Sequence, residues 1–319
     1  MQEKSYFKYF QGKRFFITGG TGFFGKSILD CASNSGIDME LVILSRDPAK
    51  FRQNYKLNEK KNLKISFIEG DILNCTFPAG VFDYVIHAAA EADTCQEDAP
   101  GNENLILEGT KRILNFSARA KVQGMLFISS GAVYGAQPAE TRCISENCNP
   151  EPTTFYGKGK LLAEQLCADS GLNVLLARCF SFVGPRMNFM SHFAIGNFIK
   201  NCLCNETISI HGDGTALRSY LYADDLVRWL FTMLLNGQKG RPYNVGSDRA
   251  VSIRELAETV RRLLGAENDI EVLGQTVPGA APNRYIPSIE RAKNELGLSI
   301  ATELEEAILK TAALKRALI

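Results

Sequence analysis

Residues 14–25 read RFFITGGTGFFG, an apolar run that leads directly into a glycine-rich turn. The run Arg14–Thr18 is typical of a strand, and helical periodicity extends from Gly25 to Ser35. Glycines permit a tight turn, let backbone amides approach a diphosphate and let the helix lie close to the strand. The positive end of the helix dipole then faces the phosphates. A bare strand-to-helix turn is the alternative, but the order of strand, glycines and helix favours a dinucleotide-binding site.

Short apolar runs and longer amphipathic stretches alternate through the first half of the chain. We expect further strands at 41–45, 65–68, 84–87, 125–129 and 174–177, and helices at 103–120 and 154–170. Apolar strands separated by helices are typical of a parallel sheet with helices on both faces. Residues 1–180 are therefore predicted to form a doubly wound α/β domain of the Rossmann type.

The pattern changes from about residue 181 to longer loops that carry Gly, Pro and Asn. Helices are expected at 224–235, 252–264, 288–296 and 302–318. These features predict a smaller, mixed α/β substrate domain over 181–319. The run 243–247 is expected to return to the main sheet as one more strand.

Composition excludes several classes of function. The 319 residues carry a net charge of +1 and are 45% hydrophobic, so a large core is expected and no global field attracts nucleic acid or an anionic membrane. There is no apolar stretch of about 18 residues and no signal-peptide core, so we expect a cytoplasmic protein without a membrane or nucleic-acid partner. The nine cysteines are scattered and match no zinc spacing, so reduced thiols and no metal are expected.

Three residues carry the predicted proton chemistry. Tyr156 and Lys160 stand at i and i+4 on one face of a predicted helix. The ordinary pKa of a phenol is about 10, and a nearby ammonium, helped by a positive nicotinamide ring, favours the tyrosinate near neutral pH. The spacing alone is common in surface pairs, but Ser130 follows the predicted strand 125–129 at the sheet edge where α/β proteins bind ligands. We therefore predict Ser130, Tyr156 and Lys160 as the catalytic residues.

The end of the second predicted strand bears on the choice of cofactor. Ser45 and Arg46 stand where an NAD enzyme commonly places an acid for the ribose hydroxyls. A hydroxyl followed by a guanidinium favours the 2′-phosphate of NADP instead. The alternative is a surface turn in which Arg46 pairs with Asp47, and NAD stays open as the cofactor.

The spacing Gly-x-x-Gly-x-x-Gly, the Tyr-x-x-x-Lys pair and the segment Ser130-Gly-Ala-Val-Tyr-Gly135 together resemble the extended short-chain dehydrogenase/reductases, which modify nucleotide sugars. The resemblance covers nearly the whole chain. It implies that Ser130 hydrogen-bonds the reacting oxygen, that Tyr156 is the acid or base, and that Lys160 tunes Tyr156 and holds the ribose, whereas Tyr134 packs or makes a minor substrate contact. The implied cofactor-binding residues are Gly19, Gly22, Phe23, Phe24, Gly25, Ser45, Arg46, Asp71, Ile72, Ala88, Ala89, Asn104, Tyr156 and Lys160.

The resemblance also implies the substrate residues Ser181, Arg218 and Arg284. Ser181 stands in a segment similar to the family's Arg-x-x-Asn-x-x-Gly-Pro loop, where it replaces the Asn. Arg218 and Arg284 align with arginines that grip a nucleotide diphosphate, a task that suits the forked guanidinium. The alternative for Arg218 is a structural salt bridge with Asp224 or Asp225.

The two residues after Ser130 narrow the range of reactions. The family's dehydratases carry Asp-Glu there, and its decarboxylases a Glu at the second position, but this chain has Gly131 and Ala132. The resemblance therefore implies a nucleotide-diphosphate-sugar oxidoreductase, first a 4-keto-hexose reductase and alternatively a 4-epimerase that retains NAD. A reductase of a non-sugar carbonyl and a catalytically silent binding protein are the remaining alternatives. Relatives dimerise through helices equivalent to 103–120 and 154–170, so a homodimer is expected.

Overall fold

The computed structural model describes residues 5–55, 62–89, 99–189, 193–277, 279 and 281–316. The chain divides into two compact units, and each is assembled from three segments. The first unit comprises Met1–Val133, Pro152–Arg178 and Val227–Tyr243. The second comprises Tyr134–Glu151, Cys179–Leu226 and Asn244–Ile319.

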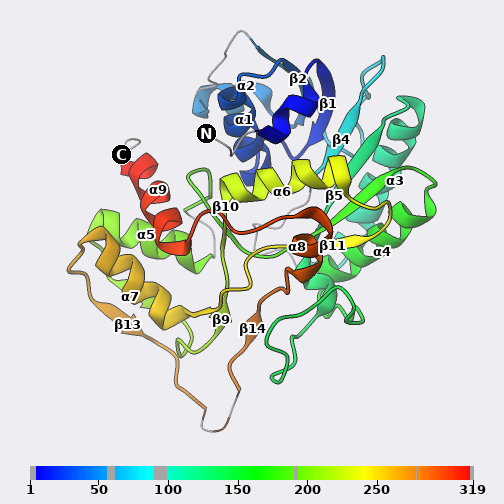
Figure 1. Cartoon of the computed structure of the whole chain (residues 1–319). Coiled ribbons are helices and arrows are strands. Elements are labelled where there is room, and N and C mark those ends of the chain that lie inside the picture. Colours follow the sequence, from blue (N-terminus) through cyan, green and yellow to red (C-terminus); the bar gives the residue numbers. More distant parts are fainter. Residues whose placement is uncertain are drawn as a thin grey trace. The chain divides into compact units, whose positions relative to one another are not determined.

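The first unit is built on a seven-stranded sheet in the order β11-β6-β5-β4-β1-β2-β3 (Figure 1). Its strands are β1 (Lys13–Thr18), β2 (Met39–Ser45), β3 (Leu63–Glu69), β4 (Tyr84–His87), β5 (Gly124–Ser130), β6 (Val174–Cys179) and β11 (Pro242–Val245). Neighbouring strands from β3 to β5 pair in parallel, with Phe15 opposite both Leu41 and Tyr84. The predicted Rossmann-type sheet is confirmed. The strand order changes direction between β1 and β4, and ligands of open α/β sheets bind at the carboxyl ends of such strands.

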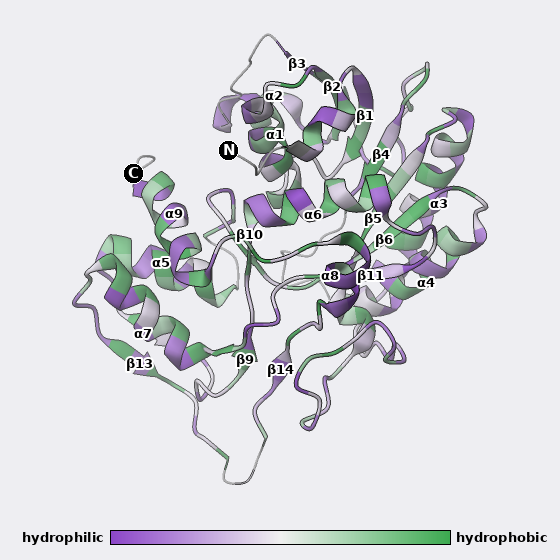
Figure 2. Ribbon diagram, viewed as in Figure 1, coloured by the Kyte–Doolittle hydropathy of each residue, from purple (hydrophilic) through white to green (hydrophobic). Residues whose placement is uncertain are grey.

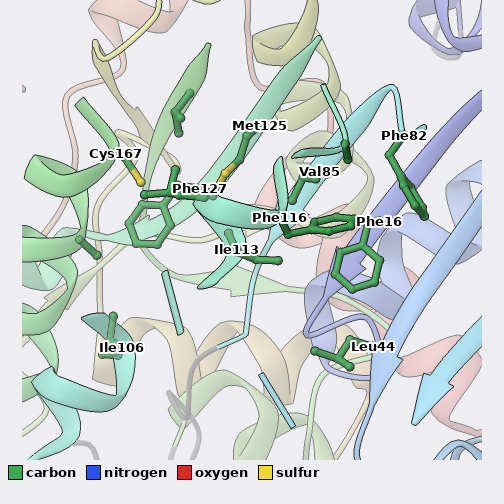
Figure 3. Close-up of a cluster of buried hydrophobic side chains, with 14 of the residues drawn as sticks. Phe16, Leu44, Phe82, Val85, Ile106, Ile113, Phe116, Met125, Phe127 and Cys167 are labelled. Atoms are coloured by element: carbon green, nitrogen blue, oxygen red, sulfur yellow. The ribbon is translucent and has the colours of Figure 1, made fainter. Parts of the chain in front are cut away.

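Helices and buried rings cover the sheet of this unit. The helices are α1 (Phe23–Ser35), α2 (Pro48–Asn54), α3 (Asn102–Arg119), α4 (Phe155–Asp169) and the later part of α6 (Ala223–Asn236). On the α3 side, Phe16 of β1 lies 4.8 Å from Phe116, measured between ring centroids, within a core that includes Phe82 and Phe127 (Figure 3). This burial of apolar rings is the main favourable term that holds α3 against the sheet.

An aromatic cluster covers the sheet near the amino ends of β1 and β4. The 3-10 helix η1 (Ser5–Phe10) supplies Phe7 and Phe10, which are fully buried. Their ring centroids lie 4.7 and 5.1 Å from that of Phe231 on α6. Phe15 also contacts Phe231 at 5.7 Å, and because strand residues alternate in direction, it points to the face opposite Phe16. Helix η1 thus completes the apolar core on the face of the sheet that α6 covers.

The second unit contains short strands and four helices within the described residues. The helices are α5 (Ala194–Cys204), α7 (Ile253–Leu264), α8 (Glu290–Leu296) and α9 (Leu304–Arg316). The strands form the small sheets β10-β7, β13-β8 and β12-β9-β14, from β7 (Phe182–Val183), β8 (Ile208–Ile210), β9 (Leu217–Arg218), β10 (Leu221–Tyr222), β12 (Val251–Ser252), β13 (Ile270–Val272) and β14 (Arg284–Tyr285). Helix α7 begins at a capping box in which Ser252 and Glu255 bond each other's backbone amides. It carries both hydrophilic and hydrophobic residues (Figure 2), and its Leu256 and Val260 are fully buried.

The division into units differs from a single boundary at residue 180 in two segments. Residues 134–151 belong to the second unit, where the Ile144 amide donates to the Ile286 carbonyl over 2.9 Å. Residues 227–243 belong to the first unit, where Phe231 joins the aromatic cluster. Periodicity along the sequence locates a helix, but it does not reveal which core receives the helix's apolar face.

Candidate active site

The glycine-rich turn forms a backbone cradle at the carboxyl end of β1. Gly19 adopts a φ of +70°, and a Cβ on it would lie 2.6 Å from the carbonyl carbon of Ala88. A Cβ on Gly25 would lie 2.2 Å from the Cα of Gly20, so only glycine lets α1 start this close to the turn. Gly22 is the N-cap of α1 and has no side chain to cover the first-turn amides. These features fit the diphosphate of a dinucleotide at a helix N-terminus.

The segment after β3 lies against helix α3. Asp71 accepts the Leu73 amide at Oδ1 over 2.9 Å, which shapes the turn that follows the strand. Ile72 contacts α3 at Gly109, where a Cβ would approach the Ile72 Cγ2 to 3.2 Å. Asp71 and Ile72 are both half-buried and follow β3, the strand that pairs with β2, and their contact with a cofactor stays a prediction.

Three predicted cofactor residues, Phe23, Phe24 and Asn104, lie in the first turns of helices. Phe23 and Phe24 open α1, are half-buried, and stack edge-to-face with ring centroids 5.8 Å apart. Asn104 lies in the first turn of α3 and is exposed. Its neighbour Glu103 contacts α4 at Gly159, where a Cβ would approach the Glu103 Cα to 2.7 Å. The backbone of α3 beside Asn104 therefore touches the helix that carries Tyr156 and Lys160.

The end of β2 combines a buried hydroxyl with an exposed guanidinium. Ser45 is 5% exposed, and its Oγ accepts the Asp47 amide over 3.3 Å. Arg46 is exposed. The Asp47 carboxylate accepts the Lys50 amide over 2.8 Å and caps α2, so the acid next to Arg46 has a structural role of its own.

Backbone contacts bring Tyr156 and Ser130 to the same region. Ser130 is the last residue of β5, and its Oγ accepts the Ala132 amide over 3.1 Å. Tyr156 lies in the first turn of α4, next to Gly157, where a Cβ would lie only 2.6 Å from the Ala132 carbonyl oxygen. The start of α4 therefore touches the turn that follows Ser130. Glycine at position 157 permits this close contact, because any larger side chain would collide with the carbonyl.

Lys160 holds a buried positive charge beside the Tyr156 ring. It is 2% exposed, and its Nζ donates to the Ile128 carbonyl over 2.7 Å. The Nζ lies 5.6 Å from the centroid of the Tyr156 ring and 5.0 Å from that of Phe127. A cation here favours negative charge on the phenol oxygen by Coulombic attraction. Helix α4 thus presents the tyrosine and the ammonium together, as their spacing predicts.

A buried ion pair, which sequence reasoning missed, fixes α4 to the sheet. Glu164 stands one turn after Lys160, and its carboxylate accepts Nε and Nη2 of Arg178 at 2.7 to 3.1 Å. The Ser129 hydroxyl also donates to Glu164 Oε1. Ser129 precedes Ser130 on β5 and Arg178 lies on β6, so Glu164 joins α4 to two strands behind the catalytic residues. The spacing of Tyr156, Lys160 and Glu164 by four residues is the sequence signal for this shared face.

The predicted substrate residues lie in the second unit. Ser181 is half-buried, and its carbonyl accepts the Leu221 amide over 3.1 Å where β7 meets β10. Arg218 donates through Nη1 to the Asn283 side chain over 3.0 Å. The Nε of Arg284 is buried without a hydrogen-bond partner among the described residues.

The strand register bears on how Arg218 and Arg284 would act together. β9 and β14 pair in parallel, with Leu217 opposite Arg284 and Arg218 opposite Tyr285. Directly opposed residues share a face of a sheet and successive residues alternate, so the two arginines start from opposite faces of this small sheet. That Arg218 and Arg284 bind the same diphosphate remains a prediction.

Tyr134 is a structural residue of the second unit. Its hydroxyl donates to Asn244 Oδ1 over 2.8 Å, and the Asn244 amide group donates to the carbonyls of Ile144 and Ser288. Tyr134 is 4% exposed and Asn244 is fully buried. These bonds connect two of the unit's three segments, 134–151 and 244–319, in agreement with the packing role that the sequence indicates.

Two classes of feature are missing from the described ranges. No three His, Cys, Asp or Glu side chains there come together as potential metal ligands. No helix within the same ranges is long and apolar enough to span a membrane.

The glycine cradle at the sheet's switch point and the Tyr156–Lys160 helix beside Ser130 define a nicotinamide-dependent enzyme on a Rossmann-type sheet. The chain belongs to the NAD dependent epimerase/dehydratase family, whose model matches residues 15–246. It is therefore a member of the extended short-chain dehydrogenase/reductases, and the resemblance inferred from the sequence is confirmed.

Individual relatives cover nearly the whole chain. UDP-glucuronic acid decarboxylase 6 of Arabidopsis thaliana is 28% identical over 94% of this chain and 88% of its own length. The UDP-N-acetylglucosamine 4-epimerase of Methanobrevibacter ruminantium M1 superposes with a TM-score of 0.83 at 22% identity, covering 97% of this chain and 100% of its own. The UDP-glucuronic acid 4-epimerase of Bacillus cereus in complex with NAD has a TM-score of 0.80 at 23% identity and covers 96% and 97%. Both structures share the fold of this chain.

Proposed function

We propose that this chain is an NADP-dependent reductase that converts the 4-keto group of a nucleotide-diphosphate-linked hexose into a hydroxyl group. The observation that carries this proposal is the set Ser130, Tyr156 and Lys160 together with Gly131 and Ala132, which cannot ionise. Elimination of water and decarboxylation each use an additional acid or base at these positions in the family. Carbonyl reduction needs only a hydride and one proton.

The three residues divide the proton chemistry among them. Ser130 donates a hydrogen bond to the carbonyl oxygen and holds it near the phenol. Tyr156 delivers the proton to the same oxygen as charge develops there, a step typically worth about 10²–10⁴ in rate. Lys160, anchored by its bond to the Ile128 carbonyl, keeps positive charge at the tyrosine and would hold the ribose of the bound cofactor. The bound nicotinamide cofactor supplies the hydride.

NADP is proposed as the cofactor because of the end of β2. Arg46 is exposed and follows the buried Ser45, and the forked guanidinium suits the oxygens of a 2′-phosphate. Gly19, Gly22 and Gly25 would hold the diphosphate through the backbone.

A nucleotide-diphosphate sugar is proposed as the substrate because the names of the three relatives described above refer to such sugars. Arg218 and Arg284 are proposed to bind the diphosphate and Ser181 the sugar. The decarboxylase relatives do not change the proposed reaction, because Ala132 offers no carboxylate.

A 4-epimerase that retains NAD is the second candidate. The 4-epimerase folds and the NAD complex among the similar structures favour it. It uses the same three residues, since oxidation and reduction of one carbinol carbon need the same proton transfer. Reduction of a non-sugar carbonyl and a silent binding role are weaker alternatives, because the whole catalytic set is present.

The deciding experiment is incubation of the purified protein with a nucleotide-linked 4-keto-6-deoxyhexose and NADPH. A reductase consumes NADPH in proportion to the sugar reduced, which is followed by the loss of nicotinamide absorbance. An epimerase instead interconverts a UDP-hexose and its 4-epimer without net loss of cofactor. Tyr156→Phe is the matched control, expected to bind NADPH normally but to lose turnover by roughly 10²–10⁴-fold. Stable absorbance with every 4-keto sugar tested would exclude the reductase.

We also propose a homodimer formed through α3 and α4. These helices contact each other at Gly159, and they expose Leu105 and Leu162 at 55% and 43%. A dimer formed through this helix pair would remove the exposed apolar surface of both leucines from water. Sedimentation equilibrium tests this, and Leu162→Glu is expected to shift the protein towards monomer.

A further inference from the structure

His87 is buried at the carboxyl end of β4 between two threonines. Its Nδ1 lies 2.7 Å from Thr18 Oγ1, and its Nε2 lies 3.4 Å from Thr110 Oγ1. Thr18 ends β1, immediately before Gly19, and Thr110 lies on α3. Both threonines are fully buried and His87 is 3% exposed. The imidazole thus bridges two adjacent strand ends and the helix that comes after them.

The direction of each hydrogen bond is set by its neighbours. The Thr110 hydroxyl donates to the Ile106 carbonyl over 2.7 Å, so towards His87 it only accepts, and Nε2 carries the proton. Burial lowers the pKa of His87 to about 3, with the nearby Lys160 charge as a second cause, so the ring is neutral and Nδ1 is bare. The Thr18 hydroxyl must then donate to Nδ1. Its oxygen in turn accepts the Ala89 amide over 3.2 Å.

The result is a one-way chain of donors from Ala89 through Thr18, His87 and Thr110 to the Ile106 carbonyl. We call these five groups the His87 relay. Its first member is the backbone of a predicted cofactor residue. The preceding amide, of Ala88, donates to the Thr18 carbonyl over 3.2 Å, and the Ala88 carbonyl lies against Gly19.

We propose that His87 is a positioning residue for the nicotinamide cofactor, holding Ala88 and Ala89 against the glycine turn through the His87 relay. This role rests on the proposed cofactor site but not on the direction of the reaction or on the sugar. If the Thr18 hydroxyl is removed, the half-buried Ala89 amide loses its acceptor and the buried Nδ1 of His87 loses its donor. The backbone of Ala88 and Ala89 then moves away from the glycine turn, and the cofactor binds more weakly.

The test compares Thr18→Val with Thr18→Ser in the full chain. Valine keeps the size of threonine but removes the hydroxyl, whereas serine keeps the hydroxyl. Titration with NADPH and NADH, followed by nicotinamide fluorescence without sugar, measures the dissociation constant. We expect Thr18→Val to raise it at least tenfold and Thr18→Ser to stay within threefold of the wild type. An unchanged dissociation constant in Thr18→Val, with only a lower melting temperature, would show a purely structural role and overturn the inference.

A second pair of variants keeps the inference testable if Thr18→Val does not fold. His87→Asn can still accept the Thr18 hydroxyl through its amide oxygen, whereas His87→Phe cannot accept any hydrogen bond. Cofactor affinity should therefore be kept better by His87→Asn, and equal losses in the two variants would contradict the relay. Where Thr18→Val does fold, the double variant Thr18→Val with His87→Phe should lose no more cofactor affinity than the more affected single variant. Because these titrations contain no sugar, they test the role of His87 in cofactor binding even if the reductase assay fails.

Discussion

The ion pair between Glu164 and Arg178 allows a quantitative test of how the catalytic helix is held. The change is Glu164→Gln, which keeps the side chain's size and an oxygen for the Ser129 hydroxyl but removes the negative charge. The amide nitrogen of Gln then faces the Arg178 guanidinium, so two donors meet and the arginine charge stays buried without compensation. Both side chains are nearly inaccessible, at 6% and 5% exposed, so solvent does not screen the loss.

The expected cost is derived from that burial. Removing one partner of a buried ion pair costs about 3–5 kcal/mol, because the remaining charge stays in a low dielectric. For a domain of roughly 150–250 residues, each kcal/mol lowers the melting temperature by roughly 2–4 °C, so a decrease of about 6–20 °C is expected. Since Glu164 lies one turn from Lys160, the variant should also lose activity at temperatures where it remains folded.

Urea unfolding and thermal scans measure the loss, and Glu108→Gln is the control. Glu108 pairs with Lys111 on α3 at 2.6 Å, but both side chains are exposed, so its loss should cost less than about 1 kcal/mol. The double variant Glu164→Met with Arg178→Met removes both charges and should be less destabilised than Glu164→Gln. The assigned anchoring role is wrong if Glu164→Gln lowers the free energy of unfolding no more than Glu108→Gln does. It is also wrong if the losses in unfolding free energy from the separate Glu164 and Arg178 changes add up to that of the double variant.

Four further predictions concern other parts of the first unit. Gly25→Ala places a Cβ 2.2 Å from the Gly20 Cα, so α1 must shift, and NADPH-dependent kcat/KM should fall on the order of 100-fold in steady-state assays. Arg46→Ala should weaken NADPH binding about 10- to 100-fold and leave NADH binding unchanged, as measured by fluorescence titration. Phe10→Ala should lower the free energy of unfolding by about 3–5 kcal/mol in urea without changing KM, because the ring packs at the amino end of the sheet. Burial lowers the pKa of His87 to about 3, so between pH 6.5 and about 3 the unfolded chain binds a proton there that the folded chain does not. The free energy of unfolding therefore falls as the pH falls, by up to about 1.4 kcal/mol per pH unit. In acid unfolding experiments, His87→Phe should show a shallower dependence on pH than the wild type.

Features set by neighbouring residues could be predicted from the sequence. The glycine turn after Thr18 and the shared helix face of Tyr156 and Lys160 both depend on local periodicity, and both are present. Helix α2 was not predicted, although Asp47 followed by Pro48 is a cap-and-first-turn pattern, because a helix of seven residues is hard to distinguish from a turn.

Features set by distant residues could not be predicted. Glu164 meets Arg178, and His87 meets Thr18 and Thr110, only because the strand order places β1, β4, β5 and β6 side by side. Each of these residues reads in the sequence as an ordinary polar position within a helix or strand. Their role appears once burial removes water as the alternative partner and every donor needs an acceptor in the protein.

The first unit is assembled from three separate segments of the chain, and this affects how it folds during synthesis on the ribosome. The strands β1 to β6 leave the ribosome well before α6 and β11, which complete the sheet and bring Phe231 onto the rings of Phe7 and Phe10. Until then one sheet edge and one aromatic face are open to other chains, the situation in which nascent proteins aggregate. A fragment of residues 1–180, although it contains the predicted catalytic residues, would stay in that state permanently. We expect such a fragment to be insoluble when expressed alone.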